Sequence, residues 1–177
     1  MVQLQISLRG VHPAVWRRLL VLGSVRLAKL HLMLQAAMGW TNSHMHAFRI
    51  GDARYGVQFD PHPAGEIHES SVTVVGALKG TTDFVYEYDF GDSWEHDVVV
   101  QAVTTNALGL KVAVCLAGEN ACPPEDCGGV GGYALLVEAL ADPSTESREH
   151  LIAWVDGSFD PTKFDLVEAN IALQRLR

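Results

Sequence analysis

The feature that most constrains the fold is a long alternating segment, "DFVYEYDFGDSWEHDVVVQAV", at residues 83–103. Aromatic and β-branched residues alternate with acidic ones on both sides of a central "FGDSW", which is typical of two strands joined by a tight turn. Side chains alternate between the two faces of a strand. The segment therefore predicts a hairpin within a sheet that has one aromatic face.

The turn of this hairpin admits two registers. A two-residue loop at 91–92 suits the positive φ of glycine, but it would mix aromatic and acidic residues on one face. A three-residue loop at 91–93 keeps the aromatic face intact, and because the buried face largely sets the register, we expect this one. Its facing pairs are Phe90–Trp94, Tyr88–His96, Tyr86–Val98 and Phe84–Val100.

The opposite face of the hairpin is acidic. In the expected register Glu87 faces Asp97 and Asp89 faces Glu95, and like charges directly across a strand pair are destabilising. Either this face is fully solvated, or a cation sits on it, such as an arginine or a metal ion. His96 falls on the aromatic face, where a histidine is more often a hydrogen-bonded core residue than a ligand.

Further periodic segments surround the hairpin. Alternation predicts strands within residues 2–9, 14–23 and 109–118, and the Gly- and Pro-rich stretch 52–70 is expected to be a loop with one short strand. Residues 119–132, "ENACPPEDCGGVGG", contain two prolines and four glycines. We expect that stretch to be irregular.

A helical period replaces the alternation after the second predicted strand. Leu27, Leu30 and Leu34 predict a helix that Ser24 caps and Gly39 ends. Further helices are expected at 133–141, 144–155 and 164–176. This order predicts an α+β fold: a single domain over 1–177 with a mixed or antiparallel sheet, one helix after strand 2 and a C-terminal helical segment.

Composition narrows the class of protein further. The 177 residues are 48% hydrophobic and carry a formal net charge of -8, which argues against a broad nucleic-acid surface. No apolar run reaches the length of a membrane span, and no signal peptide is visible. We therefore expect a cytoplasmic protein with no membrane partner, for which a protein partner is possible.

His44 and His46 are the first candidate metal ligands. On an extended segment two residues apart, their imidazoles point the same way and could reach one ion. Asp92, His96 or a cysteine could complete the set, with zinc favoured by thiols and magnesium, manganese or calcium favoured by carboxylates. The alternative is that one histidine packs near Trp40 while the other is solvated.

The cysteines are Cys115, Cys122 and Cys127. Their odd number, without an export signal, argues against a disulfide framework. Four residues separate Cys122 from Cys127, a spacing that allows zinc binding but also suits two buried free thiols in a rigid loop. The following "CGGVGGY" lacks the Lys-Ser/Thr of a P-loop. It could offer backbone N–H groups to an anion, or simply pack closely.

Four stretches together carry a family resemblance: "HPAVWRRLLV", "LHLMLQAAMGWTNSHMHAFRI", "YDFGDSWEHDV" and "CLAGENACPPEDCGGVGGY". In this order they resemble the plasmid pRiA4b ORF-3-like family, some members of which carry an insertion-sequence TnpR or resolvase-like label. The resemblance implies a single α+β domain, found in mobile-element and stand-alone contexts, of uncharacterised function. The family pattern falls on Trp16, Arg17, Trp40, His44, His46, Phe48, Tyr88, Asp89, Gly91, Asp92, Trp94, His96, Pro123, Pro124, Glu125, Asp126, Gly128 and Gly129.

Our first functional hypothesis is a metal-binding domain, which could act as a metal-dependent hydrolase. Imidazoles and carboxylates from three motifs would form its polar site. The candidate metal ligands are His44, His46, Asp92 and His96, with Cys122 and Cys127 as thiol alternatives. The catalytic candidates are Asp89, Asp92, His96, Glu125 and Asp126.

Two other classes of function remain open. In a protein-interaction module, the same residues would form a polar network that fixes the fold, and the tryptophans would form the core or a peptide groove. A DNA-associated accessory protein of a mobile element would instead need a basic face. The residues available for that face are Arg9, Arg17, Arg18 and Arg49.

Overall fold

The structure is a computed structural model that describes residues 1–57, 65–107, 109–142, 144–145, 148–155 and 159–176. Most of the expected loop at 52–70 is described, and residues 58–64 lie outside the described part. The expected helix start at 144–147 is also only partly described.

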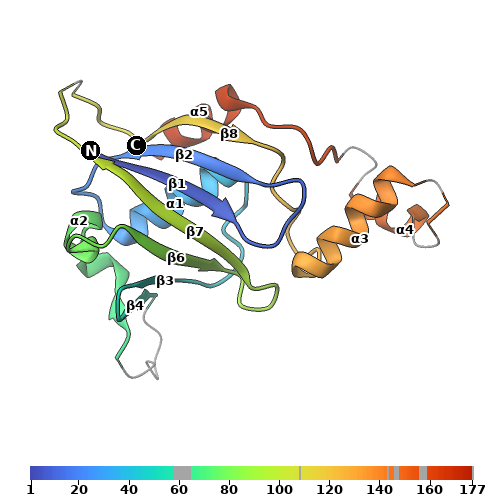
Figure 1. Ribbon diagram of the computed structural model, residues 1–177, viewed down its shortest axis with the longest axis horizontal. Helices are drawn as coiled ribbons and strands as arrows, with labels where there is room; N and C mark the ends of the chain where they lie inside the picture. The colour runs from blue at the N-terminus through green and yellow to red at the C-terminus, as the bar shows by residue number, and fades with distance from the viewer. Residues whose placement is uncertain (58–64, 108, 143, 146–147, 156–158, 177) are drawn as a thin grey trace.

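Eight strands in the described residues form one sheet, in the order β5-β4-β3-β6-β7-β1-β2-β8 (Figure 1). Neighbouring strands are antiparallel except β4 and β5, which are parallel. The α+β class and the mixed sheet are thus confirmed. The strands are β1 (Val2–Leu8), β2 (Trp16–Val21), β3 (His46–Ile50), β4 (Ala53–Gly56), β5 (Ile67–His68), β6 (Asp83–Tyr88), β7 (Trp94–Val103) and β8 (Val114–Glu119).

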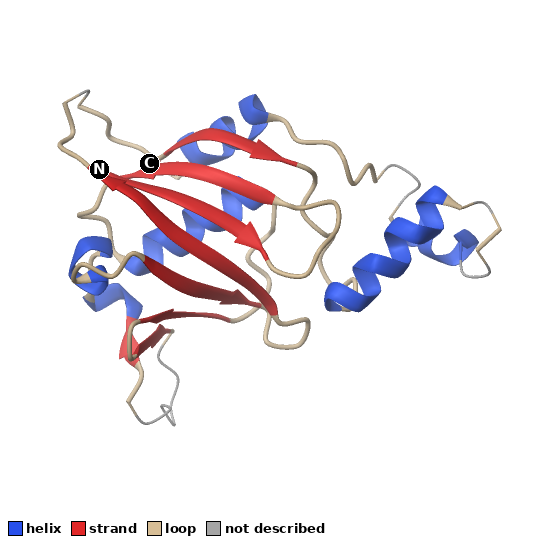
Figure 2. Ribbon diagram, in the orientation of Figure 1, coloured by secondary structure: helices blue, strands red, loops and turns tan. Residues whose placement is uncertain are grey.

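The helices lie behind the sheet and at both ends of its strands (Figure 2). Helix α1 runs across the back of the strands, α5 packs against α1 and β8, and α3 with α4 extends beyond the strand ends. The confirmed helix after strand 2 is α1. The helices are α1 (Leu27–Met38), α2 (Val74–Leu78), α3 (Gly129–Ala141), α4 (Arg148–Trp154) and α5 (Leu166–Gln174), with a 3₁₀ turn at Glu69–Ser71.

Two predictions about helix ends were wrong. Ser24 does not cap α1, because Arg26 occupies the N-cap position and no side chain caps it. Helix α3 begins at Gly129, inside the stretch expected to be irregular. Glycine disfavours a helix but does not forbid it, and tertiary contacts decide here. The predicted C-terminal end of α1 is confirmed: Gly39 is left-handed, with φ 102°, and donates to the carbonyl of Gln35.

The predicted register of the β6–β7 hairpin was also wrong. Tyr88 pairs with Trp94 and Tyr86 with His96, so the loop spans residues 89–93. The aromatic face survives, because these four side chains are buried in the core. Phe90 lies in the loop, with 43% of its surface exposed.

The buried face of the sheet and α1 enclose the hydrophobic core. The α1 residues that face it include Leu30 and Leu34, and the central strands contribute aliphatic and aromatic side chains. At about 1.5–3 kcal/mol for each fully buried large side chain, this interface dominates the favourable free energy of folding. The strand residues of this hydrophobic core with no exposed surface are Val2, Leu4, Ile6, Leu19, Val21, Phe48, Tyr86, Tyr88, Trp94 and Val98.

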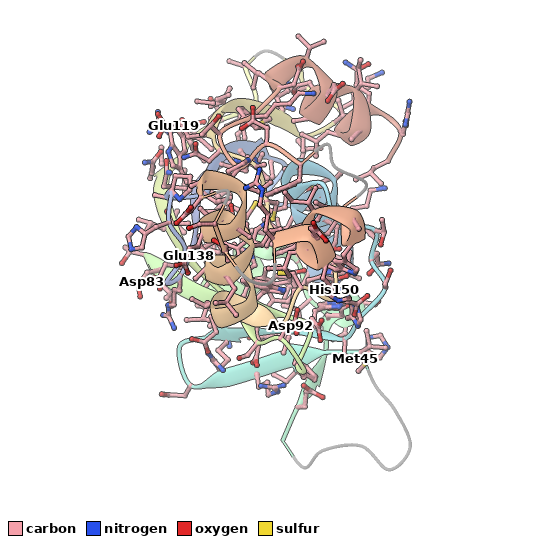
Figure 3. All side chains as sticks on the ribbon, turned by 90° about the vertical axis from the view of Figure 1, so that its right-hand side faces the viewer. Met45, Asp83, Asp92, Glu119, Glu138 and His150 are labelled. Atoms are coloured by element: carbon pink, nitrogen blue, oxygen red, sulfur yellow. The ribbon has the colours of Figure 1, made fainter. Side chains whose placement is uncertain are left out.

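The other face of the sheet is open and carries the acidic residues of the hairpin, which arginines neutralise. Glu87 faces Glu95 directly, and not Asp97 as expected. Arg49 from β3 forms ion pairs with Glu87 and Glu95, and Arg9 forms ion pairs with Glu95 and Asp97. Of the two interpretations of this face, the structure therefore favours arginine cations. Figure 3 shows this face on its left, where Asp83 and Glu119 are labelled.

Candidate metal centre

Three ligand-type side chains from separate loops meet at one end of the sheet. His44 precedes β3, Asp89 follows β6, and Asp126 precedes α3. One donor atom from each lies within 4.8 Å of the other two. In the part of the chain that the structure describes, this is the one group of three His, Cys, Asp or Glu side chains that meets this distance limit.

The distances within the cluster suit a shared cation. His44 Nε2 lies 3.1 Å from Asp126 Oδ1 and 3.6 Å from Asp89 Oδ2. Donor atoms that are each about 2.1 Å from one ion stand about 3.0–3.4 Å apart in octahedral or tetrahedral geometry. His44 Nε2 is buried and makes no hydrogen bond to a described residue. A buried ring nitrogen that faces two carboxylates without a hydrogen bond is placed as a metal ligand would be.

Glu125 forms the fourth side of the cluster. Its Oε1 accepts hydrogen bonds from the Thr41 backbone N–H at 2.8 Å, from the Thr41 hydroxyl at 3.0 Å and from the Tyr88 hydroxyl at 3.0 Å. Its Oε2 faces the cluster, 3.9 Å from His44 Nε2. Oε2 also accepts from the Tyr88 hydroxyl, at 3.2 Å. These donors fix the carboxylate with Oε2 on the side of the cluster.

Backbone geometry holds the two aspartates in uncommon conformations. Asp89 has φ 55° and Asp126 has φ 58°, in the left-handed region that few residues other than glycine adopt, although aspartate does so more readily than most. Asp89 Oδ1 accepts from the backbone N–H of Gly91 at 2.9 Å, which leaves Oδ2 toward His44. Such left-handed positions are often found at functional sites.

A hollow opens beside the cluster. Its volume is about 370 Å³, and it is lined by Ser43, His44, Met45, Asp89 and the 90–91 segment. The apolar side chains of Met45 and Phe90 are both partly exposed at its edge. Figure 3 looks onto this end of the molecule, where Met45 and Asp92 are labelled. The hollow therefore connects the candidate ion site with solvent, so that a small molecule could reach the ion.

Comparison with known proteins identifies the family of this chain. Its residues 1–168 match the family of plasmid pRiA4b ORF-3-like proteins. The chain belongs to this family. The uncharacterized protein y4hQ of Sinorhizobium fredii is 39% identical over 178 residues, which cover 99% of this chain and 91% of the relative. The crystal structure of MM3350, a protein of unknown function from Methanosarcina mazei Go1, has a TM-score of 0.86 and 30% identity. That match covers 94% of this chain and 96% of the other.

His44 and His46 belong to one motif of the pRiA4b ORF-3-like family, but the fold gives them different partners. His44 joins the cluster, whereas His46 is buried in β3, where its Nε2 lies 2.7 Å from Glu69 Oε2. The His46 ring also stacks on His31, with ring centroids 3.4 Å apart. Burial beside His46 lowers the pKa of His31 to about 4. The two imidazoles therefore form a core network, at a distance from the candidate ion.

Asp92 and His96, the remaining candidates of the hairpin motif, have other partners. His96 is fully buried, its Nδ1 lies 3.1 Å from the Tyr86 carbonyl, and burial lowers its pKa to about 4. Asp92 Oδ2 accepts from the backbone N–H of Gly128 at 3.1 Å, directly before α3. The anion at this glycine-rich helix start is thus the protein's own Asp92 carboxylate, which suits the positive end of a helix dipole.

The cysteines are all free thiols. Cys115 is buried in β8, and burial raises the pKa of all three thiols, that of Cys127 to about 12. Among the described residues no thiol joins a group of three ligand-type side chains. Burial disfavours the thiolate form that binds metals, and all three cysteines belong to the hydrophobic core or pack against it.

The four arginines of the candidate basic face all have partners within the chain. Arg9 and Arg49 are engaged by carboxylates, and Arg18 donates to Gln5 at 3.1 Å. Arg17 is buried and donates to backbone carbonyls. Among the described residues, no helix is both long enough and apolar enough to span a membrane.

Sequence reasoning missed the side chains that support the site. Tyr88 was expected as part of the aromatic face and of the family pattern but not as a support of the site, and its hydroxyl holds Glu125. Thr41 and Glu69, which bind Glu125 and His46, were not candidates. Nothing in a single sequence distinguishes such residues, because their partners lie far away in the chain.

Proposed function

We propose that this protein binds a divalent metal ion through His44, Asp89 and Asp126, with Glu125 as a fourth ligand or as a neighbouring base. The observation that carries the proposal is the buried, unbonded Nε2 of His44, which faces carboxylate oxygens of Asp126 and Asp89 at 3.1 and 3.6 Å. The alternative is an ion pair between a protonated His44 and the same two carboxylates, and metal titration distinguishes the two roles.

The donor set indicates which ion would bind. One imidazole nitrogen with two or three carboxylate oxygens suits Mn²⁺ or Zn²⁺ better than Mg²⁺ or Ca²⁺, which prefer oxygen ligands alone. A bound ion would activate a water molecule for hydrolysis. The Oε2 of Glu125 is placed to accept a proton from a group at the cluster. A metal-dependent hydrolase is therefore the enzymatic form of this proposal.

Metal titration of the full chain, purified without an affinity tag and stripped by chelator, tests the proposal. We expect one Mn²⁺ or Zn²⁺ per chain by calorimetry and a rise in the thermal midpoint with saturation. His44→Ala and Asp89→Asn should each lower the affinity at least about tenfold. His12→Ala and Asp83→Asn, which remove an exposed imidazole and an exposed carboxylate elsewhere, should not. If all four variants bind alike, or if the parent protein binds no ion, the proposal fails.

A further inference from the structure

A second cavity lies on the far side of Glu125 from the cluster. It is bounded by the C-terminal end of α1, the 121–125 segment and the start of α5, and its volume is about 410 Å³. A neighbouring hollow of about 550 Å³ shares Glu125 and Lys163 with it. Both volumes fall in the range of small-molecule sites.

The cavity walls are largely apolar, with few polar groups. Trp40, Phe159 and Phe164 supply aromatic surface, and alanines of α1 and α5 leave the space open. Such a cavity, apolar with a small number of converging charges, is the usual form of a small-ligand site.

One of those charges is Arg17, which is 2% exposed. Its guanidinium donates to the carbonyls of Trp16, Ala37, Glu119 and Asn120 and stacks on Phe164. These bonds use four of the five N–H groups of an arginine. Among the described residues no carboxylate pairs with it, and burial lowers its pKa. Arg9, which has two carboxylate partners, shows the opposite shift in pKa.

A second cation stands at the mouth of the cavity. The Lys163 side chain lines both hollows. Within the described residues it makes no hydrogen bond or ion pair, although its charge helps to lower the pKa of Asp160. Arg17 and Lys163 thus place two positive charges in a lining that also contains the carboxylates of Glu125, Asp165 and Glu168.

The acidic residues of the cavity limit which anion fits. Asp165 accepts from the N–H groups of Val167 and Glu168 as the cap of α5, and Glu125 Oε1 is held by Thr41. The Glu168 carboxylate is exposed at the rim. A ligand with two or more negative charges would be repelled there.

We propose that this cavity binds a small organic monocarboxylate with an apolar body. The carboxylate would lie between Arg17 and Lys163, and the apolar part would rest on the aromatic walls. This second site can be tested without the proposed metal, because the carboxylate would contact Arg17 and Lys163, which are not members of the cluster.

Calorimetric titration with phenylacetate, using the chelator-stripped full chain, tests this site alone. Phenylacetamide and phenethylamine serve as neutral and cationic ligands of nearly the same shape. We expect saturable binding of phenylacetate only. Lys163→Gln should weaken it about threefold, Ala36→Phe should fill the cavity and abolish it, and Lys111→Gln should leave it unchanged. Arg17 is not substituted, since its carbonyl contacts support the fold.

Three results would overturn the proposal: no saturable binding of phenylacetate, equal binding of the amide or amine, or unchanged binding in both Lys163→Gln and Ala36→Phe. Circular dichroism of each variant confirms that it folds, and Ala172→Leu replaces Ala36→Phe if the latter does not. A failed metal titration would leave these results unaffected, because the measurement is made without metal.

Discussion

At the scale of the single residue, Tyr88 links the aromatic core to the candidate metal centre. Its ring is buried against Trp40, while its hydroxyl donates to Glu125 and accepts from the Ser43 N–H at 3.0 Å. Burial is the largest cause that raises the pKa of this phenol to about 12. The hydroxyl therefore stays protonated at neutral pH and can donate to the carboxylate.

Tyr88→Phe removes this donor and keeps the ring. We expect metal affinity to fall about 2- to 12-fold, the equivalent of a hydrogen bond worth about 0.5–1.5 kcal/mol. The matched control is Tyr133→Phe, because the buried Tyr133 hydroxyl has no hydrogen-bond partner among the described residues. That variant should leave affinity unchanged and be neutral or stabilising. Calorimetry measures the metal affinity, and urea denaturation measures the free energy of unfolding. If both variants bind the metal equally well, Tyr88 does not support the site.

At the scale of the element, α3 is attached to the hairpin through its glycine-rich start. Gly129 has φ +67°, and a Cβ added there would lie 2.6 Å from the Asp92 carbonyl oxygen. A side chain at this position meets both backbone strain and a steric clash. Asp126 lies three residues earlier, so the attachment of α3 also positions a candidate ligand.

Gly129→Ala should lower the free energy of unfolding by about 1–3 kcal/mol and weaken metal binding. Gly131→Ala lies in the same helix, and its added Cβ would meet nothing within 4 Å. It should be neutral or stabilise by up to about 1 kcal/mol, because alanine favours a helix. Urea denaturation measures the free energy of unfolding of both variants. Similar losses of stability in the two would contradict the prediction.

At the scale of the whole molecule, hydrophobic periodicity predicted the sheet but not every pairing within it. A shift of two residues returns each side chain to its own face. The pairs Tyr88–His96 and Tyr88–Trp94 therefore bury the same aromatic residues, and alternation alone does not distinguish them. The loop at 89–93 is decided by Asp89, whose left-handed backbone and side-chain bonds to Gly91 form the turn.

The candidate site was less predictable than the fold. Asp89, Asp126 and His44 were all candidates, but they come from three loops whose approach depends on the sheet order and on α3. His46 illustrates the difficulty, since spacing paired it with His44 while the start of β3 turns it toward a buried Glu69. Residue type identified the candidate ligands, and only the fold could separate them from core residues of the same types.

The two core histidines with low pKa values also set how the whole molecule responds to acid. His31 and His96 have pKa values of about 4 in the folded protein, chiefly because burial disfavours the charged ring, against 6.5 as the ordinary value. The unfolded chain therefore binds more protons than the folded chain between these values. The free energy of unfolding is greatest above pH 6.5 and falls as the pH drops toward 4.

From pH 7.5 to 5.5 we expect a loss of about 2–3 kcal/mol, since each histidine contributes up to about 1.4 kcal/mol per pH unit below 6.5. Carboxylates such as Asp97, whose pKa is lowered by Arg9, stay ionised over this range. His96→Gln removes one titrating ring but keeps an N–H that can donate to the Tyr86 carbonyl. It should therefore remove about half of the pH dependence. Urea denaturation at several pH values measures this slope, and a parent protein equally stable at pH 7.5 and 5.5 would show that neither imidazole is kept neutral by the core.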